Sequence, residues 1–356
     1  MRAESINVTK LALVPDNAPA NKRPKKKPTI IDVAERSGLS KSLVARALAG
    51  RDGVSKSSRE RILRAADELG YQRNAWARSL VKGSTQIFGV VATDISSTYR
   101  LEVIVGIEDA AASRSYTTIL AHGRRDPEVL AQRLDQMMEL GVDGMIVVSS
   151  RIPTDRLTRA GERMPVVVVG RPDTVPDSVD LIRNDDETGG ALATQHLIDL
   201  GHTHIGFVAS SDRAAIRARE GAWFDTMTAA GLNTDWIARR NGANDLAQVV
   251  ADRIANESEP PTALVVSTDG LAAAIVGAAV DRGIAVPDEL AVVGYNNSAL
   301  ATQIRPALTS VDQPRGQMGA TAVEMLFERL GGRTTQRIDV VEPRLVVRGS
   351  TQPDAR

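Results

Sequence analysis

From about Ile87 onward, short apolar segments rich in β-branched residues alternate with amphipathic segments of helical period. These apolar segments are apolar throughout, as expected of parallel strands covered on both faces of a sheet. Repeated strand–helix units require right-handed crossovers and form doubly wound sheets. Roughly ten strands in about 270 residues predict two such sheets, with a ligand cleft at the carboxyl ends of their strands. The expected strands include IFGVVAT, TTILAH, GMIVVS, VVVVG, HIGFVAS, TALVVST and LAVVGYN.

Residues 28–73 carry the signals of three short helices. A small hydroxyl residue precedes each helical segment, where its side chain can accept a hydrogen bond from a free backbone N–H group. Glycine follows two of the segments and suits the left-handed conformation that ends a helix. Because only a short turn joins the first two segments, they predict a helix-turn-helix. The predicted N-caps are Thr29, Ser40 and Ser55, and the predicted C-caps are Gly38 and Gly70.

The second helical segment, from Ser40 to Leu48, has two different faces. At helical period one face is apolar and should pack in a core, whereas the other is short, basic and able to form hydrogen bonds. Such a face suits contacts with base edges or phosphates of DNA, and the alternative is an ordinary solvated face. The apolar face holds Leu43, Val44, Ala47 and Leu48, and the polar face holds Lys41, Ser42, Ala45 and Arg46.

Charge is distributed unevenly along a chain whose 44 basic and 44 acidic residues leave no net charge. Residues 1–83 hold 18 Lys and Arg against 8 Asp and Glu, a net charge of +10, and residues 84–356 hold 26 against 36. A basic head on an acidic body predicts that the head binds nucleic acid. Residues 1–27, with the run KRPKKK, are expected to form a disordered basic arm that binds phosphates; a nuclear-import signal is the alternative.

Several missing patterns narrow the function. The chain has no cysteine, which removes disulfides and thiolate metal sites. It has no apolar run of the ~20 residues that span a bilayer and no signal-peptide pattern, so we expect a soluble, cytoplasmic protein without a membrane partner. Phosphate-loop, dinucleotide-fingerprint and nucleophile-elbow motifs are missing. His202 and His204 have no third ligand nearby, so we predict no catalytic residue, no metal and no cofactor.

Seven segments in a fixed order resemble the lactose-repressor family of bacterial transcription regulators: TIIDVAERSGLSKSLVARALAG, VSKSSRERILRAADELGYQRNAWARSL, VDGMIVV, LGHTHIGFV, VPDELAVVGYNN, RPALTSVDQP and PRLVVRGS. The resemblance covers about residues 28–351. It implies a helix-turn-helix headpiece, a hinge helix and a two-subdomain α/β core like that of periplasmic sugar-binding proteins. The implied segments are the arm 1–27, the headpiece 28–73, the hinge and linker 74–84 and the core 85–356. Within the core, one subdomain is expected at 85–184 and 312–331 and the other at 185–311 and 332–351.

The same resemblance makes residues 40–48 a recognition helix for the major groove of DNA. Ala45 departs from the pattern, because the family commonly has Ser before the Arg. The segment NAWARSLVKG matches the hinge helix, in which Leu80 corresponds to a leucine wedged between base pairs in the minor groove; the alternative is an amphipathic linker. The implied DNA-binding residues are Thr29, Ser40, Lys41, Ser42, Arg46, Ser55, Asn74, Ala77, Arg78, Leu80 and Lys82.

In the core, the segment DRAAIRAREGAW resembles the one whose arginines reach into the family's effector cleft. Arg219 takes the position of a sugar-binding arginine; the alternative is an exposed helix face rich in arginine. Asn296 stands where many members have an aspartate, and Asp269 matches an acidic residue that opens a helix, with capping as its first role and ligand contact as its second. The implied effector-binding residues are Tyr99, Arg100, Arg213, Arg219, Asp269 and Asn296.

Arginines gather on the segments expected to border this cleft, while the family's usual aspartate is missing at Asn296. This combination raises the electrostatic potential at the ligand. We therefore expect a sugar acid or sugar phosphate to bind better than a neutral sugar, with Arg219 as a bidentate clamp. Pairing of the arginines with Asp185, Asp212 or Asp269 would instead restore a neutral site for ordinary sugars. The arginines are Arg100, Arg171, Arg213, Arg217 and Arg219.

The resemblance predicts a homodimeric repressor that binds a palindromic double-stranded DNA operator and responds to a small-molecule effector. Dimer contacts are expected from residues 101–114 and their neighbours. The rival interpretation is a solute-binding protein or sugar-modifying enzyme with an incidental basic head. Binding to specific DNA would separate the two.

Overall fold

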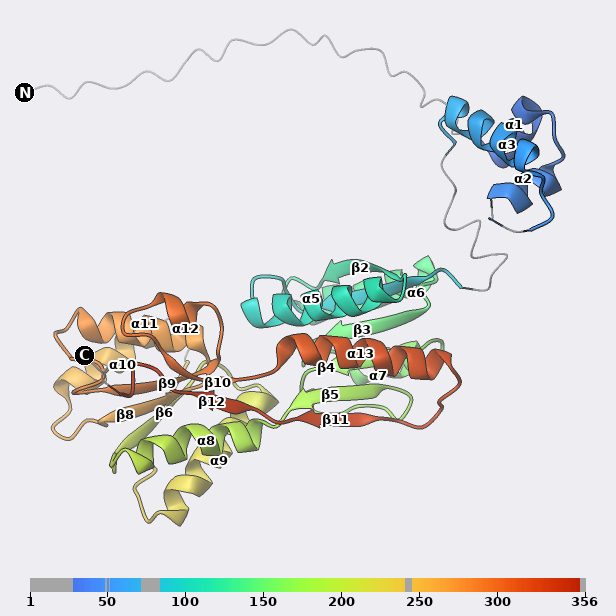
Figure 1. The fold of residues 1–356 in the computed structure, drawn as a ribbon. Coiled ribbons are helices and arrows are strands. Elements are labelled where there is room, and N and C mark those ends of the chain that lie inside the picture. Colours follow the sequence, from blue (N-terminus) through green and yellow to red (C-terminus); the bar gives the residue numbers. More distant parts are fainter. Residues whose placement is uncertain (1–27, 49, 51, 72–83, 241–244, 353–356) are drawn as a thin grey trace, which may run out of the picture. The chain divides into compact units, whose positions relative to one another are not determined.

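The structure is a computed structural model that describes residues 28–48, 50, 52–71, 84–240 and 245–352 (Figure 1). The chain divides into two compact units, residues 1–78 and residues 79–356, which we call the headpiece unit and the core. Within the described residues, no helix combines the length and the apolar character that crossing a bilayer requires.

The described part of the headpiece unit contains three helices, as the sequence predicts: α1 (Ile30–Ser37), α2 (Lys41–Leu48) and α3 (Lys56–Leu69). Thr29 and Asp32 form a reciprocal capping box at the start of α1. The Oγ atoms of Ser40 and Ser55 accept hydrogen bonds from backbone N–H groups in the first turns of α2 and α3. Gly38 and Gly70 end α1 and α3 at φ angles of 61° and 63°, in the left-handed region. The predicted caps are therefore confirmed.

A small apolar core joins the three helices. Val33 of α1, Val44 of α2 and Ile62 of α3 are fully buried against one another. Two polar contacts supplement this core, an ion pair of 2.6 Å between Arg36 and Glu68 and further hydrogen bonding between α3 and α2. These contacts hold the three helices together as one small unit.

The first subdomain of the core is a six-stranded parallel sheet with the order β11-β5-β4-β3-β1-β2. Helices α5 and α13 cover one face and α6 and α7 the other (Figure 1). α5 and α13 pack closely, since a Cβ added at Gly106 would lie 2.2 Å from the carbonyl oxygen of Gly316. The strands are β1 (Ile87–Ala92), β2 (Thr117–His122), β3 (Gly144–Val148), β4 (Val166–Val169), β5 (Asp180–Asn184) and β11 (Ile338–Val341), and the helices are α5 (Thr98–Ser113), α6 (Pro127–Leu140), α7 (Thr154–Gly161) and α13 (Arg315–Leu330).

The second subdomain is another six-stranded sheet, with the order β12-β10-β9-β8-β6-β7. Helices α8 and α9 pack on one face and α10 and α11 on the other, so the expected pair of doubly wound sheets is confirmed. The strands are β6 (Ile205–Ala209), β7 (Ile237–Arg239), β8 (Ala263–Val266), β9 (Ala291–Asn296), β10 (Thr309–Asp312) and β12 (Arg344–Val346), and the helices are α8 (Asp186–Asp199), α9 (Ala214–Ala229), α10 (Leu246–Asn256), α11 (Asp269–Val280) and the short α12 (Leu300–Gln303).

One detail of the predicted core is wrong. Residues 332–351 were expected in the second subdomain, but β11 pairs with β5 at the edge of the first sheet. The last crossing between the subdomains, after those from β5 to β6 and from β10 to α13, therefore lies between β11 and β12. Pro343 lies at this crossing and cannot donate to a strand ladder, which separates the two short strands. In addition, β12 runs antiparallel to β10, so the second sheet is not purely parallel.

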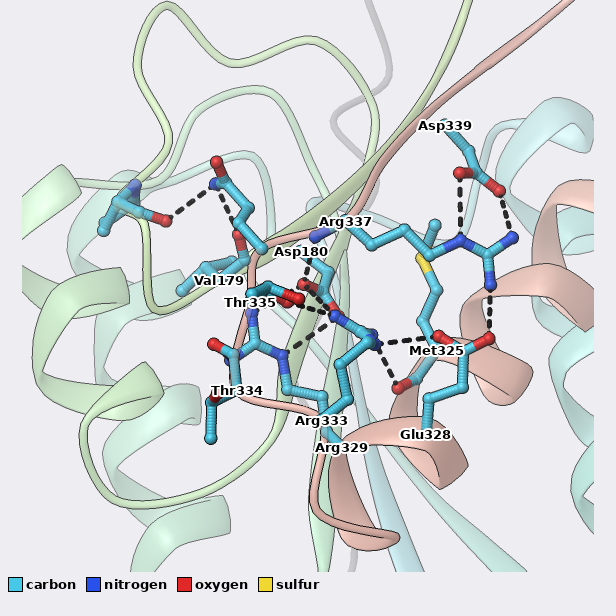
Figure 2. Close-up of polar contacts among 12 residues, drawn as sticks. Val179, Asp180, Met325, Glu328, Arg329, Arg333, Thr334, Thr335, Arg337 and Asp339 are labelled. Atoms are coloured by element: carbon cyan, nitrogen blue, oxygen red, sulfur yellow. Dashed lines mark hydrogen bonds and ion pairs between the residues drawn. The ribbon is translucent and has the colours of Figure 1, made fainter.

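A buried carboxylate fixes the segment that connects α13 to β11 through hydrogen bonds. Asp180, at the start of β5, has no solvent exposure and accepts hydrogen bonds from the guanidinium groups of Arg329 and Arg333 and from the backbone N–H of Arg337 (Figure 2). The shortest N···O distances to each arginine side chain are 2.6 Å. One side chain of β5 therefore fixes both the end of α13 and the segment that leads into β11.

Candidate DNA-binding face and effector cavity

Helix α2 presents the two faces that its sequence predicts. Val44, Ala47 and Leu48 are buried in the headpiece core. Lys41, Ser42, Ala45 and Arg46 are exposed on the other side. The exposed side therefore carries the charges of Lys41 and Arg46. The hydroxyl groups of Ser40 and Ser42 lie beside them, with their Oγ atoms 3.2 Å apart. This chemistry matches base edges and phosphates in the major groove.

Two other predicted DNA contacts, Thr29 and Ser55, are exposed residues whose hydroxyl groups also form capping contacts. Their positions at helix N-termini also suit a phosphate, because N-terminal N–H groups attract anions. The predicted hinge contacts Asn74, Ala77, Arg78, Leu80 and Lys82 lie outside the described residues, as do residues 1–27.

The core encloses a cavity of about 150 Å³ between its two sheets, lined by residues of both subdomains. Its walls come largely from the carboxyl ends of parallel strands and the segments that follow them, as the sequence analysis expects. Five of the six predicted effector residues line the cavity: Tyr99, Arg100, Arg213, Arg219 and Asn296. Sequence reasoning missed Ser149, Ser150, Arg151, Asp186 and Gln313, although the first three directly follow the apolar segment of β3.

Arg219 forms a buried ion pair at the base of the cavity. Its Nη2 lies 2.8 Å from Asp186 Oδ1, and the two side chains are only 7% and 3% exposed. Its Nε also donates to Asp186 and its Nη1 donates to the carbonyl oxygen of Ser267. The guanidinium carbon lies 3.5 Å from the centroid of the Tyr295 ring. The charge of Arg219 is therefore already neutralised within the protein, which argues against its predicted role as the clamp for an anion.

Asn296 and Tyr99 contribute polar groups to the cavity wall. Asn296 has a φ of 109°, and its Oδ1 accepts a hydrogen bond of 2.7 Å from Gln313. Loss of hydration, followed by the negative charge of Asp186, raises the pKa of Tyr99 to about 12. Tyr99 is thus a neutral phenol at physiological pH, and these side chains suit the hydroxyl groups of a ligand.

The predicted ligand contact of Asp269 is wrong, because this residue does not line the cavity. Asp269 is 1% exposed and accepts hydrogen bonds from the backbone N–H and the hydroxyl of Ser298 and from the hydroxyl of Ser310. Burial raises its pKa. Asp269 is the first residue of α11, and its carboxylate joins this helix to the loop after β9 and to β10, so its role is structural.

Three other arginines of the expected cluster, Arg100, Arg171 and Arg217, are paired, but with carboxylates that differ from those named in the sequence analysis. Arg100 lies 3.0 Å from Asp94, and Arg171 donates to both oxygens of Glu187. Arg217 does not line the cavity and instead pairs with Asp173 at 2.9 Å. Among the three expected partners, Asp212 forms an ion pair, with Arg151 at 3.4 Å, whereas Asp185 caps α8 and Asp269 is engaged as described above.

Comparisons with known proteins assign both units. Residues 29–74 match the lacI family of bacterial regulatory proteins, and residues 194–351 match a periplasmic binding protein-like domain. The repressor PurR of Vibrio parahaemolyticus serotype O3:K6 (strain RIMD 2210633) is 33% identical over 333 residues, covering 91% of this chain and 98% of the relative. The chain belongs to the lacI family of bacterial regulatory proteins. Catabolite control protein A of Priestia megaterium is 31% identical, covering 91% of this chain and 99% of the relative.

Solved structures agree with this lacI-family assignment. The lac repressor dimer bound to operator and the anti-inducer ONPF has a TM-score of 0.81 at 23% identity, covering 92% of this chain and 99% of that chain, and it supports the fold alone. The complex of the transcriptional regulator CelR with cellobiose has a TM-score of 0.67 at 29% identity, covering 91% of this chain and 99% of that chain.

Proposed function

We propose that this lacI-family chain is a transcriptional repressor that binds operator DNA through α2 and is controlled by a small molecule in the core cavity. The two-faced α2, with Lys41, Ser42 and Arg46 exposed on a well-capped headpiece, carries the proposal. The relatives PurR and catabolite control protein A are regulators, and the solved complex of CelR with cellobiose supports a sugar or sugar-derived effector. A cytoplasmic location is part of the proposal, because the protein must reach the chromosome.

We further propose that the repressor acts as a homodimer. Helix α5 buries Val103 and Ile107 in the first subdomain but leaves Leu101 and Val105 43% and 55% exposed. Leu120, on the neighbouring edge strand β2, is 46% exposed. Apolar side chains grouped at a sheet edge suit a two-fold contact between identical subunits. A dimer would present two recognition helices to a palindromic operator.

The rival interpretation, a solute-binding protein or sugar-modifying enzyme, is not favoured. It requires the basic head to be incidental, whereas residues 29–74 match a DNA-binding family in their own right. Within the described residues, no group of three or more His, Cys, Asp or Glu side chains is placed to hold a metal ion. No observation on the core indicates a reaction that would call for a second candidate function.

Replacing Arg46 by alanine should weaken specific DNA binding by about 1–3 kcal/mol and relax the preference at one base position. The reason is that Arg46 can donate two hydrogen bonds to a guanine edge. Selection of bound sequences from a randomised DNA pool measures both effects. Arg64→Ala, which removes the same charge from an exposed position of α3, is the matched control. Equal weakening on every sequence would show instead that Arg46 contacts a phosphate.

Replacing Val105 by aspartate should dissociate the dimer, because it places a charge in an apolar interface where it has no partner. Operator affinity should fall with it, while the core remains folded. Sedimentation or light scattering at several protein concentrations measures the molecular mass. Leu140→Asp, at another exposed apolar position at the end of α6, should leave the mass unchanged. A dimeric Val105→Asp variant would place the interface elsewhere.

A further inference from the structure

The cavity has an uncompensated positive charge. Five arginines line it, but its lining includes a single carboxylate, Asp186. Four of the arginines form ion pairs with carboxylates. For Arg213, the described part of the chain contains no carboxylate within ion-pair distance. Moreover, Asp94 serves both Arg100 and Arg125. The four pairs are Arg100 with Asp94, Arg151 with Asp212, Arg171 with Glu187 and Arg219 with Asp186.

Arg213 also has an unsatisfied donor. Its Nε is buried and has no hydrogen-bond partner, although a buried N–H group normally has one. Burial, and then the charges of Arg100 and Arg151, lower the pKa of Arg213, and Asp94 opposes them only in part. The surroundings of Arg213 therefore disfavour its charged form, and a negative charge beside it would relieve this.

The backbone around Arg213 adds to the positive potential. Arg213 is the N-cap residue of α9, and no side chain caps this helix. α9 has 16 residues, and Ala215 in its first turn lines the cavity. Free N–H groups and the helix dipole at such an end favour an anion. The free guanidinium and the helix end therefore act on the same region of the cavity.

We propose that the effector carries a carboxylate or phosphate group and that this group binds between Arg213 and the N-terminus of α9. The proposal rests on the effector role of the cavity stated under Proposed function. A hydroxyl group of a neutral sugar could accept from the Nε of Arg213 but would leave its charge without a partner, whereas an anion supplies both a charge-assisted hydrogen bond and the missing negative charge. Hydroxyl groups elsewhere on the ligand can reach Ser149, Asn296 and Gln313, which also line the cavity. Arg213, rather than Arg219, then selects the charge.

The test uses inorganic phosphate and acetate as probes of the full chain. Thermal unfolding midpoints are measured with increasing sodium phosphate or sodium acetate, against sodium chloride at matched ionic strength. At least one of the two anions should raise the midpoint of the wild-type protein above that in chloride, since a ligand that binds the folded state stabilises it. A response to phosphate alone indicates a phosphorylated effector, and a response to acetate alone a carboxylic acid.

Arg213→Gln should lower the affinity for the anion that stabilises the wild type about 10- to 100-fold, because the substitution removes the charge and the Nε donor. Arg163→Gln, which removes a charge from an exposed position outside the cavity, should bind as the wild type does. Equal midpoints of the wild type in chloride, phosphate and acetate, or an unchanged response of Arg213→Gln, would overturn the proposal. DNA binding of the wild type, measured in chloride, reports separately on the proposed repressor function, so that either can fail without the other.

Discussion

Replacing Asp180 by alanine should lower the free energy of unfolding of the core by about 3–5 kcal/mol, because it removes the carboxylate partner of Arg329 and leaves Arg333 with Glu328 alone. The side chains of Arg329 and Arg333 are only 10% and 20% exposed, and Asp180 is fully buried between them. Denaturant titration of the purified chain measures the loss. Asp339→Ala should cost about 0–1 kcal/mol, since it breaks the half-exposed pair with Arg337 at the edge of the same cluster. Equal losses in both variants would contradict the central role of Asp180.

The effect of Asp180 should depend on pH in one direction. Burial by itself raises the pKa of Asp180, but hydrogen bonds from Arg329 and Arg333 hold it below the ordinary 3.8. A carboxylate with a lowered pKa stabilises the folded state above its unfolded pKa, and this contribution is lost as the pH falls through the folded pKa. The stability difference between wild type and Asp180→Ala should thus be constant at neutral pH and shrink below about pH 4. A difference that shrinks on raising the pH from 5 to 8 would exclude this explanation.

Replacing Arg219 by methionine should also destabilise the core by about 3–5 kcal/mol, because it leaves Asp186 buried without its main partner. Asp186 is 2% exposed, so its carboxylate depends on protein groups for its partners. Denaturant titration again measures the effect. Arg239→Met, which breaks a more exposed pair with Glu220 in the same subdomain, is the matched control and should cost about 0–1 kcal/mol.

A second variant separates a structural pair from a ligand clamp. The double variant Arg219→Met with Asp186→Asn should recover part of the lost stability, because no uncompensated charge remains. If Arg219 served chiefly to bind an anionic effector, the single variant would keep wild-type stability and lose the response to phosphate or acetate. That pattern would contradict the structural assignment of Arg219.

The local features of the fold could be predicted from the sequence. Helix caps such as Thr29 and Gly38 depend on residues within one turn, and strands such as Gly144–Val148 are continuous apolar runs bounded by polar residues. The buried face of α2 follows from helical period alone. The end of the first subdomain was misplaced because β11 pairs with β5, which is distant in sequence: Ile338 lies beside Leu181, 157 residues earlier. No local pattern in the sequence indicates that pairing.

The sequence indicated several residues that line the candidate site, but not which carboxylates pair with its arginines. The family resemblance selected Tyr99, Arg213 and Asn296, and all three line the cavity. Whether an arginine is free depends on carboxylates that are distant in sequence, such as Asp186 for Arg219, 33 residues apart. Asp269 was misjudged for the same reason, since its partners Ser298 and Ser310 come from other elements. The free charge of Arg213 could therefore be found only in the folded chain.

Selection of genomic DNA fragments by the purified chain, followed by footprinting, tests the proposed repressor most directly. The fragments should come from the genome that encodes the protein. We expect enrichment of a small set of fragments that share a two-fold symmetric site, with protected half-sites about one helical turn apart or a multiple of it. The Arg46→Ala variant should enrich these fragments less strongly, with a relaxed preference at one base position, while keeping weak binding to all DNA. Binding without any preferred sequence, or no binding at moderate salt, would contradict the account.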